Sequence, residues 1–280
     1  MGTPVSLRVS PKADPYSRWE STNVVVGVAK GTVSAIAYAR LGDITSDQFR
    51  ALAAIVRDFG IEVRVTNRQN LVFRGLSTEQ LPELYQRLAD IGMAEPGAEL
   101  ARDVVSCPGA DTCNLAVTQS RGLADAIGQA LEDAGLADVG GIRINISGCT
   151  NSCGQHHVAD IGFHGAERRA HGQPAPGYQL LLGGHVGNTE VEFGHRALRL
   201  PAKAAAEATV RLVGRFADER TAGEPFAAWV ERAGGAKALA AELKDLDDWP
   251  TPEERPDYYI DFDETGPYVA EVGEGECAAG

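Results

Sequence analysis

The sequence predicts an α+β protein with two unlike domains, a small α+β domain followed by a larger α/β domain. Three observations lead to this prediction. Segments typical of strands and helices follow one another in the order β-β-α-β-β-α over about residues 23–92. Pro96-Gly97 then interrupts the pattern. Beyond this point, two cysteine pairs lie on glycine-rich segments among further predicted strands and helices.

The small domain opens with two apolar, β-branched segments, which predict strands at residues 23–26 and 33–38. A helix is expected next, because Thr45 and Gln48 form the pattern of a capping box. Apolar residues then recur at helical spacing until Gly60, where the helix should end.

The second half of this domain repeats the same kind of signals. Residues 61–65 alternate between apolar and charged side chains, which predicts a half-buried strand, and residues 71–73 predict another short strand. Ser77 and Gln80 form a second capping-box pattern, and the apolar positions that follow predict a helix ending at Gly92.

The larger domain should begin with a strand at residues 104–105 that leads into Cys107. A helix is expected over residues 114–134, so Cys113 would lie at its N-terminus, where the helix dipole stabilises a thiolate. A strand at residues 142–146 would deliver Cys149. Further strands are predicted at residues 159–164 and 178–182, and further helices at 202–216 and 226–233.

These elements divide the chain into four predicted parts. Residues 1–22 contain three prolines and suggest an irregular lead-in, 23–96 form the small domain, and 97–244 form the larger domain. Residues 245–280 form an acidic tail rich in Asp, Glu, Pro and Gly. Its composition is typical of a solvated extension, whereas its aromatic residues, among them Trp249, Tyr258, Tyr259 and Phe262, favour docking on a folded surface. The residues alone leave both interpretations open.

Charge and composition exclude several classes of function. The chain has 280 residues, a net charge of −13 and a calculated pI near 4.9. Such a surface repels nucleic-acid phosphates and anionic membranes, so neither is an expected partner. The sequence shows no apolar segment long enough to span a bilayer, and its first residues lack the apolar core of a signal peptide. We therefore expect a cytoplasmic protein.

Four cysteines carry the strongest chemical signal. Cys107 and Cys113 are spaced C-x5-C, and Cys149 and Cys153 are spaced C-x3-C; the only other cysteine is Cys277. A 4Fe–4S cluster takes one thiolate on each iron, so four converging cysteines suit it. The glycines beside these cysteines, Gly109, Gly148 and Gly154, are expected to let the backbone pass close to inorganic sulfur.

Three other interpretations compete for the cysteines. A structural zinc site also uses four thiolates, but its pairs are usually two to four residues apart, which the first pair is not. Disulfides suit a secreted chain, and the N-terminus does not look secreted. Isolated buried thiols are common, yet two glycine-flanked pairs in one domain argue against them. A structural zinc site therefore remains an alternative to the cluster, but a disfavoured one.

The residues around the cysteines resemble a known family. Two segments resemble the cluster-binding signature of siroheme-containing nitrite and sulfite reductases, namely the first pair followed by N-L-A-V-T-Q-S-R-G-L and the stretch I-N-I-S-G-C-T-N-S-C-G-Q-H-H. Upstream, W-E-S-T-N-V and T-N-R-Q-N-L-V-F-R-G resemble the family's ferredoxin-like half-domain. The resemblance covers about residues 15–240 and implies this half-domain followed by an α/β siroheme and 4Fe–4S domain.

The resemblance also implies cofactors and roles. Cys107, Cys113, Cys149 and Cys153 would ligate a 4Fe–4S cluster, and Cys153 would also bridge to the iron of siroheme. The reaction implied is the six-electron reduction of nitrite to ammonia or of sulfite to sulfide, in which the cofactors carry the redox chemistry. Arg68 would be both a catalytic and a cofactor-binding residue. Together with Gln69 and Asn70 it would bind siroheme carboxylates, since a guanidinium can donate two parallel hydrogen bonds to one carboxylate.

The length of the chain bears on its partners. The family usually contains two copies of the half-domain and cluster-domain unit, whereas this chain has one, which resembles the cysteine-bearing C-terminal half. A second half-subunit or a homodimer is therefore an expected partner, together with the anion and an electron donor such as ferredoxin or a flavoprotein reductase. An electron-transfer protein that holds only the cluster, without a substrate site, is the alternative.

Overall fold

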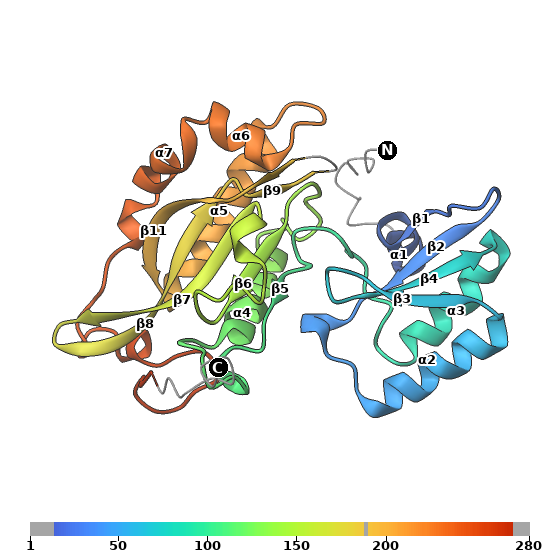
Figure 1. The fold of residues 1–280 in the computed structure, drawn as a ribbon, viewed down its shortest axis with the longest axis horizontal. Helices are drawn as coiled ribbons and strands as arrows, with labels where there is room; N and C mark the ends of the chain where they lie inside the picture. The colour runs from blue at the N-terminus through green and yellow to red at the C-terminus, as the bar shows by residue number, and fades with distance from the viewer. Residues whose placement is uncertain (1–13, 188–189, 271–280) are drawn as a thin grey trace, which may run out of the picture. The chain divides into compact units, whose positions relative to one another are not determined.

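A computed structural model describes residues 14–187 and 190–270 of the chain. The chain divides into two compact units (Figure 1). The first unit runs to Asp103 and includes Ala137–Gly140. The second contains Val104–Leu136 and continues from Gly141.

The first unit is built on an antiparallel sheet with strand order β1-β2-β4-β3. Its strands are β1 (Val24–Val26), β2 (Val33–Ala37), β3 (Glu62–Val65) and β4 (Leu71–Leu76). Its main helices are α2 (Ser46–Phe59) and α3 (Leu81–Ala89), which cover one face of the sheet (Figure 1). The predicted order β-β-α-β-β-α and the α+β class are confirmed.

The core of this unit lies between the sheet and its helices. Phe73 of β4 is fully buried and packs with Ile55 of α2 and Leu84 of α3. Both predicted capping boxes are formed. The strand predicted at residues 61–65 is present as β3. Its predicted half-burial was wrong, because β3 is an edge strand with a neighbour on one side only and all four of its residues are exposed.

An additional helix, α1 (Pro15–Asn23), corrects the prediction of an irregular lead-in for residues 15–22, while residues 1–13 lie outside the described ranges. The Asp14 carboxylate caps it by accepting a hydrogen bond from the Ser17 N–H at 3.1 Å. Pro15 stands at the first helical position, where proline favours rather than breaks a helix. Trp19 of this helix is fully buried, with its ring centroid 5.3 Å from that of Tyr85.

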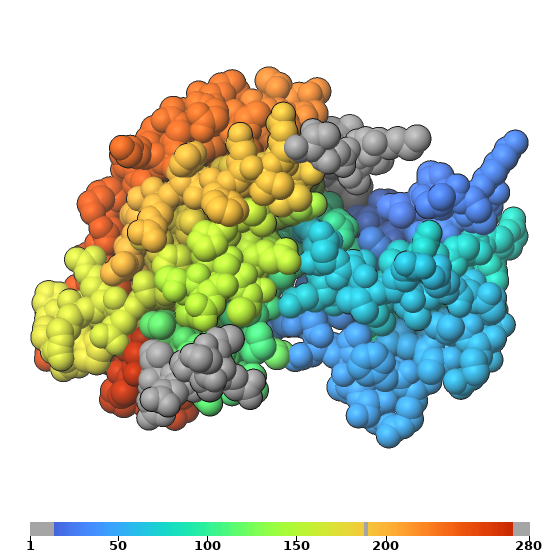
Figure 2. All heavy atoms as spheres, in the orientation of Figure 1, coloured from blue at the N-terminus to red at the C-terminus, as the bar shows by residue number. Residues whose placement is uncertain are grey.

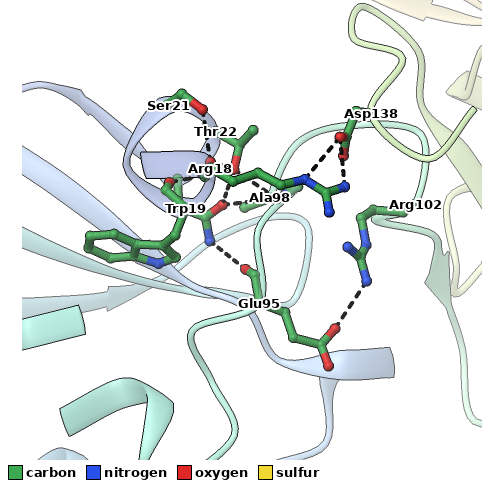
Figure 3. Close-up of polar contacts among 10 residues, drawn as sticks. Arg18, Trp19, Ser21, Thr22, Glu95, Ala98, Arg102 and Asp138 are labelled. Carbon is green, nitrogen blue, oxygen red and sulfur yellow. Dashed lines mark hydrogen bonds and ion pairs between the residues drawn. The ribbon is translucent and has the colours of Figure 1, made fainter. Parts of the chain in front are cut away.

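The boundary of the first unit lies beyond Pro96-Gly97 because the following residues stay bound to it. The Arg18 guanidinium pairs with the Asp138 carboxylate at 2.7 Å, which ties residues 137–140 to α1 (Figure 3). Arg102 pairs with Glu95 at 3.1 Å (Figure 3). Residues 97–103 and Ala137–Gly140 are thus part of the first unit.

The second unit contains a mixed five-stranded sheet in the order β11-β8-β7-β6-β5. Strands β5, β6 and β7 are parallel, whereas β8 is antiparallel to both β7 and β11. These strands are β5 (Val105–Ser106), β6 (Ile144–Ser147), β7 (Ile161–Ala170), β8 (Gln173–Leu182) and β11 (His195–Pro201). A small ribbon is formed by β9 (His185–Val186) and β10 (Val191–Glu192).

Helices cover this sheet (Figure 1). They are α4 (Ser120–Asp133), α5 (Ala205–Glu219), α6 (Phe226–Arg232) and α7 (Gly235–Glu242), and α4 packs against α5. The prediction that a helix begins at Asn114 was wrong. Residues 114–119 form a loop instead, because the N–H groups of Val117 and Thr118 both bond to the Gly148 carbonyl rather than to a helical turn.

The acidic C-terminal segment is docked through residue 270. Trp249 and Tyr259 pack against Ala170 and Ala175, at the turn that joins β7 to β8. Figures 1 and 2 show this red segment against the yellow hairpin. Of the two interpretations of the tail, docking is therefore correct for the described part, and Cys277 lies outside it. Within the described ranges, no helix has the length and apolar character needed to cross a bilayer.

Candidate metal centre

The sheet of the second unit brings the two cysteine pairs to one edge. Cys107 directly follows β5, and Cys149 follows β6 after Gly148. These strands are parallel neighbours, with Ser106 opposite Ile146. Their carboxyl ends therefore open on the same edge, which is where open α/β sheets usually bind ligands.

The backbone of Gly148 joins the two cysteine segments. Its N–H donates to the Cys107 sulfur at 3.1 Å. Its carbonyl accepts from the N–H of Val117 at 2.7 Å and from that of Thr118 at 3.2 Å. One residue next to Cys149 thus holds both the first cysteine and the loop that follows Cys113.

The glycines of these segments allow protein backbone to pack closely. A Cβ on Gly148 would lie 2.9 Å from the Gly109 Cα, and one on Gly154 would lie 2.0 Å from the Ile146 carbonyl oxygen. Gly109 also has a φ of +64°, which favours glycine. Gly148 and Gly154 are thus required by the packing of the chain itself, and the approach of their backbone to inorganic sulfur stays a prediction.

The sequence predicted that Cys113 lies at the start of the helix. In the structure, the start of α4 lies beside Cys107 instead. The Cys107 sulfur is 3.4 Å from the hydroxyl of Ser120, the first residue of α4. That hydroxyl donates to the Cys107 carbonyl at 2.8 Å. The N-terminus of α4 and the Gly148 N–H thus both lie beside this sulfur.

All four cysteines of the described chain are free thiols. Burial raises the pKa of the Cys149 thiol, the Asn151 N–H opposes this, and negative charge on Cys107, Cys113 and Cys153 raises the pKa further. The four thiols are thus close enough to act on one another electrostatically. A positively charged metal group would offset the negative charge of the thiolates that it binds.

The second pair lies on a turn with local support. Ser152 and Gln155, on either side of Cys153, have positive φ angles of 61° and 60°. The Ser147 hydroxyl accepts from the Gly154 N–H at 3.1 Å and is 2.8 Å from His156 Nδ1. Cys153 is the exposed member of the four, whereas the others are half-buried.

His156 serves this turn as a neutral side chain. It is fully buried. Burial, together with charge on His157 and His164, lowers the pKa of His156 to about 3. It therefore stays uncharged near neutral pH, which suits a hydrogen-bonding residue rather than a proton relay.

Arg68, Gln69 and Asn70 lie in the first unit, on the turn from β3 to β4, whereas the cysteines lie in the second. Arg68 is 7% exposed, and its Nε is 3.1 Å from a Glu99 carboxylate oxygen. Gln69 has a φ of +63° and packs against Gly42. The structure therefore presents Arg68 as a buried, paired arginine rather than a solvated one.

Asn70 is fully buried and holds the turn in place. Its amide oxygen accepts from the Ala39 N–H at 2.9 Å, and its amide nitrogen donates to the Asp103 carboxylate at 2.8 Å. Burial raises the pKa of Asp103 to about 6, which nearby Arg68 opposes. Both ends of the Asn70 amide are thus used within the first unit.

Several residues at these sites were not found from the sequence. Glu99 and Asp103 lie about 30 residues from the turn that they support, and no local pattern joins them to it. Asp261 and Tyr268 contact the loop after Cys113, and the aromatic content of the tail was their one signal.

The fold and the converging thiols define a cluster-binding domain preceded by a small α+β domain. Two family models match the chain, "Nitrite/Sulfite reductase ferredoxin-like half domain" over residues 29–91 and "Nitrite and sulphite reductase 4Fe-4S domain" over residues 97–247. The chain therefore belongs to the nitrite/sulfite reductase family, whose membership implies 4Fe–4S and siroheme cofactors.

The chain has relatives among both nitrite reductases and sulfite reductases. The chain is 38% identical to a ferredoxin–nitrite reductase of Synechococcus elongatus over 159 residues, which cover 56% of this chain and 31% of that protein. It is 30% identical to a sulfite reductase (ferredoxin) of Mycobacterium tuberculosis over 214 residues, which cover 73% and 38%. The chain thus spans about a third of the length of these relatives.

Solved structures agree on the fold. The NirA protein of Mycobacterium tuberculosis matches with a TM-score of 0.66 at 28% identity, covering 78% of this chain and 41% of that one. A dissimilatory sulfite reductase I matches with a TM-score of 0.61 at 12% identity, covering 89% and 81%. The second likeness concerns the fold alone.

Proposed function

We propose that this chain is the cluster-bearing half of a siroheme-dependent reductase of a small oxyanion, nitrite or sulfite. The convergence of four free thiols at the carboxyl ends of β5 and β6 is the observation that carries this proposal. When bound, the two cofactors supply the six one-electron transfers that convert nitrite to ammonia or sulfite to sulfide. The protein holds, orients and shields them.

The four cysteines suit a cluster better than a single metal ion. A structural zinc site places four ligands around one ion. In residues 14–187 and 190–270, no three His, Cys, Asp or Glu side chains are grouped closely enough to hold one ion. A four-iron cluster instead takes each thiolate on a different iron, so its ligands stay further apart. Cys107, Cys113, Cys149 and Cys153 are the proposed ligands.

Cys153 is the proposed link between the two cofactors. A sulfur that ligates one iron and also reaches the siroheme iron has to be accessible from outside its own loop. Cys153 is exposed, unlike the other three cysteines. Its turn, with positive φ at Ser152 and Gln155, is fixed on the inner side by Ser147 and His156.

Arg68 and Gln69 are the proposed contacts to siroheme carboxylates, and Arg68 is also the proposed catalytic cation. A buried guanidinium binds a carboxylate strongly because little water competes for it. Glu99 already pairs with Arg68, so a siroheme carboxylate would share or replace this partner. Asn70 contributes by fixing the turn through Ala39 and Asp103.

Partners follow from the same proposal. Relatives named as ferredoxin-dependent enzymes support ferredoxin as the electron donor, with a flavoprotein reductase as the other candidate. Because the chain spans about a third of these relatives, we expect a second half to complete the site, either another subunit or a second copy. Free thiols suit a reducing compartment, so the proposal places the chain in the cytoplasm.

The proposal is tested by the visible spectrum of the full chain. The chain is produced with siroheme biosynthesis available and purified without oxygen, and a Soret band with red-region siroheme bands is expected. Cys153→Ser should remove these bands, while Cys277→Ser, the matched control, should keep them. Siroheme bands of equal intensity in Cys153→Ser would overturn the role of this residue.

The alternative is an electron-transfer protein that carries the cluster alone. The existing pair of Arg68 with Glu99 favours it, since this arginine already has an acidic partner. It predicts iron and sulfide in the purified chain without siroheme bands, even when siroheme and a second half are supplied. The same spectrum therefore separates the two functions.

A further inference from the structure

We propose that residues 256–269, here called the C-terminal clasp, hold the first cysteine loop (residues 107–119) in its cluster-binding shape, with Asp261 and Tyr268 as positioning residues. The cluster itself belongs to the function proposed above, and the clasp rests on it. The family match ends at residue 247, so the clasp lies outside the part of the chain that defines the family.

The clasp bonds directly to the end of the cysteine loop. The Gln119 N–H donates to the Asp261 carboxylate at 2.9 Å, and the Gln119 side-chain amide donates to Glu264 at 2.8 Å. The Tyr268 hydroxyl donates to the Val117 carbonyl at 2.9 Å. Asp261 and Tyr268 are 4% and 6% exposed, so water competes little for these bonds.

Val117, which the clasp binds, is bonded in turn to Gly148, the residue that contacts the Cys107 sulfur. Val117 and Thr118 donate to the Gly148 carbonyl, and the Gly148 N–H donates to the Cys107 sulfur. Thr118 also accepts from the Ala110 N–H at 3.1 Å, which closes the loop on itself. A clasp that fixes Val117 and Gln119 therefore fixes the surroundings of Cys107 and Cys113.

The clasp is itself anchored to the second unit. Its N–H at Tyr268 donates to the Tyr259 carbonyl at 2.7 Å, and Tyr259 lies in the core beside Trp249. The Lys203 ammonium is 4.1 Å from the centroid of the Phe262 ring. A Cβ on Gly122 of α4 would lie 2.3 Å from the Phe262 Cβ, so the clasp sits tightly on this helix.

Clasp and loop together line a pocket of about 400 Å³ that is partly open to solvent. Cys113 and Asn114 line it on the loop side, and Asp261, Glu264 and Tyr268 on the clasp side. One of the four proposed ligands thus faces a space whose other wall is the clasp. Release of the clasp would open this space and leave Cys113 to solvent.

The test measures alkylation of each cysteine in the full-length apo chain. Tyr268→Phe removes the bond to Val117 and leaves the ring, so Cys113 should react about five-fold faster, the factor for about 1 kcal/mol. Tyr258→Phe removes a hydroxyl of the same clasp that has no hydrogen bond to residues 107–119 in the described structure, and should leave the rate unchanged. Cys153 serves as the internal control in every sample.

A second readout separates positioning from general stability. After reconstitution with iron and sulfide, Tyr268→Phe should hold less cluster than Tyr258→Phe and lose it sooner under chelator. Asp261→Ala should show the same effect more strongly. Equal Cys113 rates in all variants, or equal acceleration of Cys113 and Cys153, would overturn the clasp. Failure of the unmodified chain to take up iron would instead overturn the proposed cluster, while the alkylation rates still report on the clasp.

Discussion

The two cysteine loops are supported in opposite ways. The loop of Cys149 and Cys153 is held by bonds to residues seven or nine positions away, through Ser147, His156 and Asn145. The loop of Cys107 and Cys113 depends on acceptors and donors 142 to 151 residues away, in the C-terminal clasp. One half of the candidate site is therefore a local motif, and the other half depends on the fold of the whole second unit.

Gly154→Ala should break the locally held loop and give the largest effect. The new Cβ would lie 2.0 Å from the Ile146 carbonyl oxygen, a backbone atom that cannot move without shifting β6. We expect a loss of at least about 3 kcal/mol in the free energy of unfolding, together with loss of the cluster. Chemical denaturation and iron content measure the two effects.

Gly128→Ala is the matched control for this substitution. Gly128 lies within α4, and a Cβ there would meet no atom within 4 Å. Alanine favours a helix over glycine by about 1 kcal/mol, so this variant should be slightly more stable and keep its iron. Equal stability of the two variants would contradict the close packing of Gly154.

His156→Leu should loosen the same loop by a smaller amount. It removes one of the two partners of the Ser147 hydroxyl, which keeps its bond to the Gly154 N–H, and it places an apolar side chain in the buried position. We expect a loss of about 2 kcal/mol in stability and faster alkylation of Cys149 and Cys153 in the apo chain. Because the first loop has different supports, the alkylation rate of Cys113 should not change. Acceleration of Cys113 alone would contradict the conclusion that His156 supports the second loop and not the first.

The turn that carries Arg68 can be compared with the two cysteine loops. It is supported from a distance by Asp103, a residue that titrates. The Asp103 pKa is raised from 3.8 to about 6, so the folded chain holds this proton more tightly than the unfolded chain. Its stabilising contribution is therefore full below about pH 4 and is lost as the pH rises through about 6.

Asp103→Asn tests this support, because it keeps an acceptor for Asn70 and the Glu99 N–H but cannot titrate. Between about pH 5 and about pH 7, the unmodified chain should lose about 1 kcal/mol more stability than the variant. Denaturation curves at several pH values measure the difference. Parallel pH profiles would show that Asp103 does not have the raised pKa.

The same contrast explains what the sequence could predict. The β-β-α-β-β-α order, both capping boxes and the cysteine pairs are local patterns, and the fold class follows from them. The start of α4 was misplaced because the Gly148 carbonyl, 31 residues beyond Val117, captures the N–H groups that a helix at Asn114 would need. Glu99, Asp103 and Asp261 act through tertiary contacts, which no spacing in the sequence reveals.

The most direct test of the whole account is elemental analysis of the full chain, purified without oxygen, for iron, acid-labile sulfide and zinc. The account predicts about four iron and about four sulfide per chain, the content of one 4Fe–4S cluster, with both lost in Cys149→Ser and kept in Cys277→Ser. One zinc per chain with neither iron nor sulfide would contradict it, because the four thiols would then form a structural zinc site.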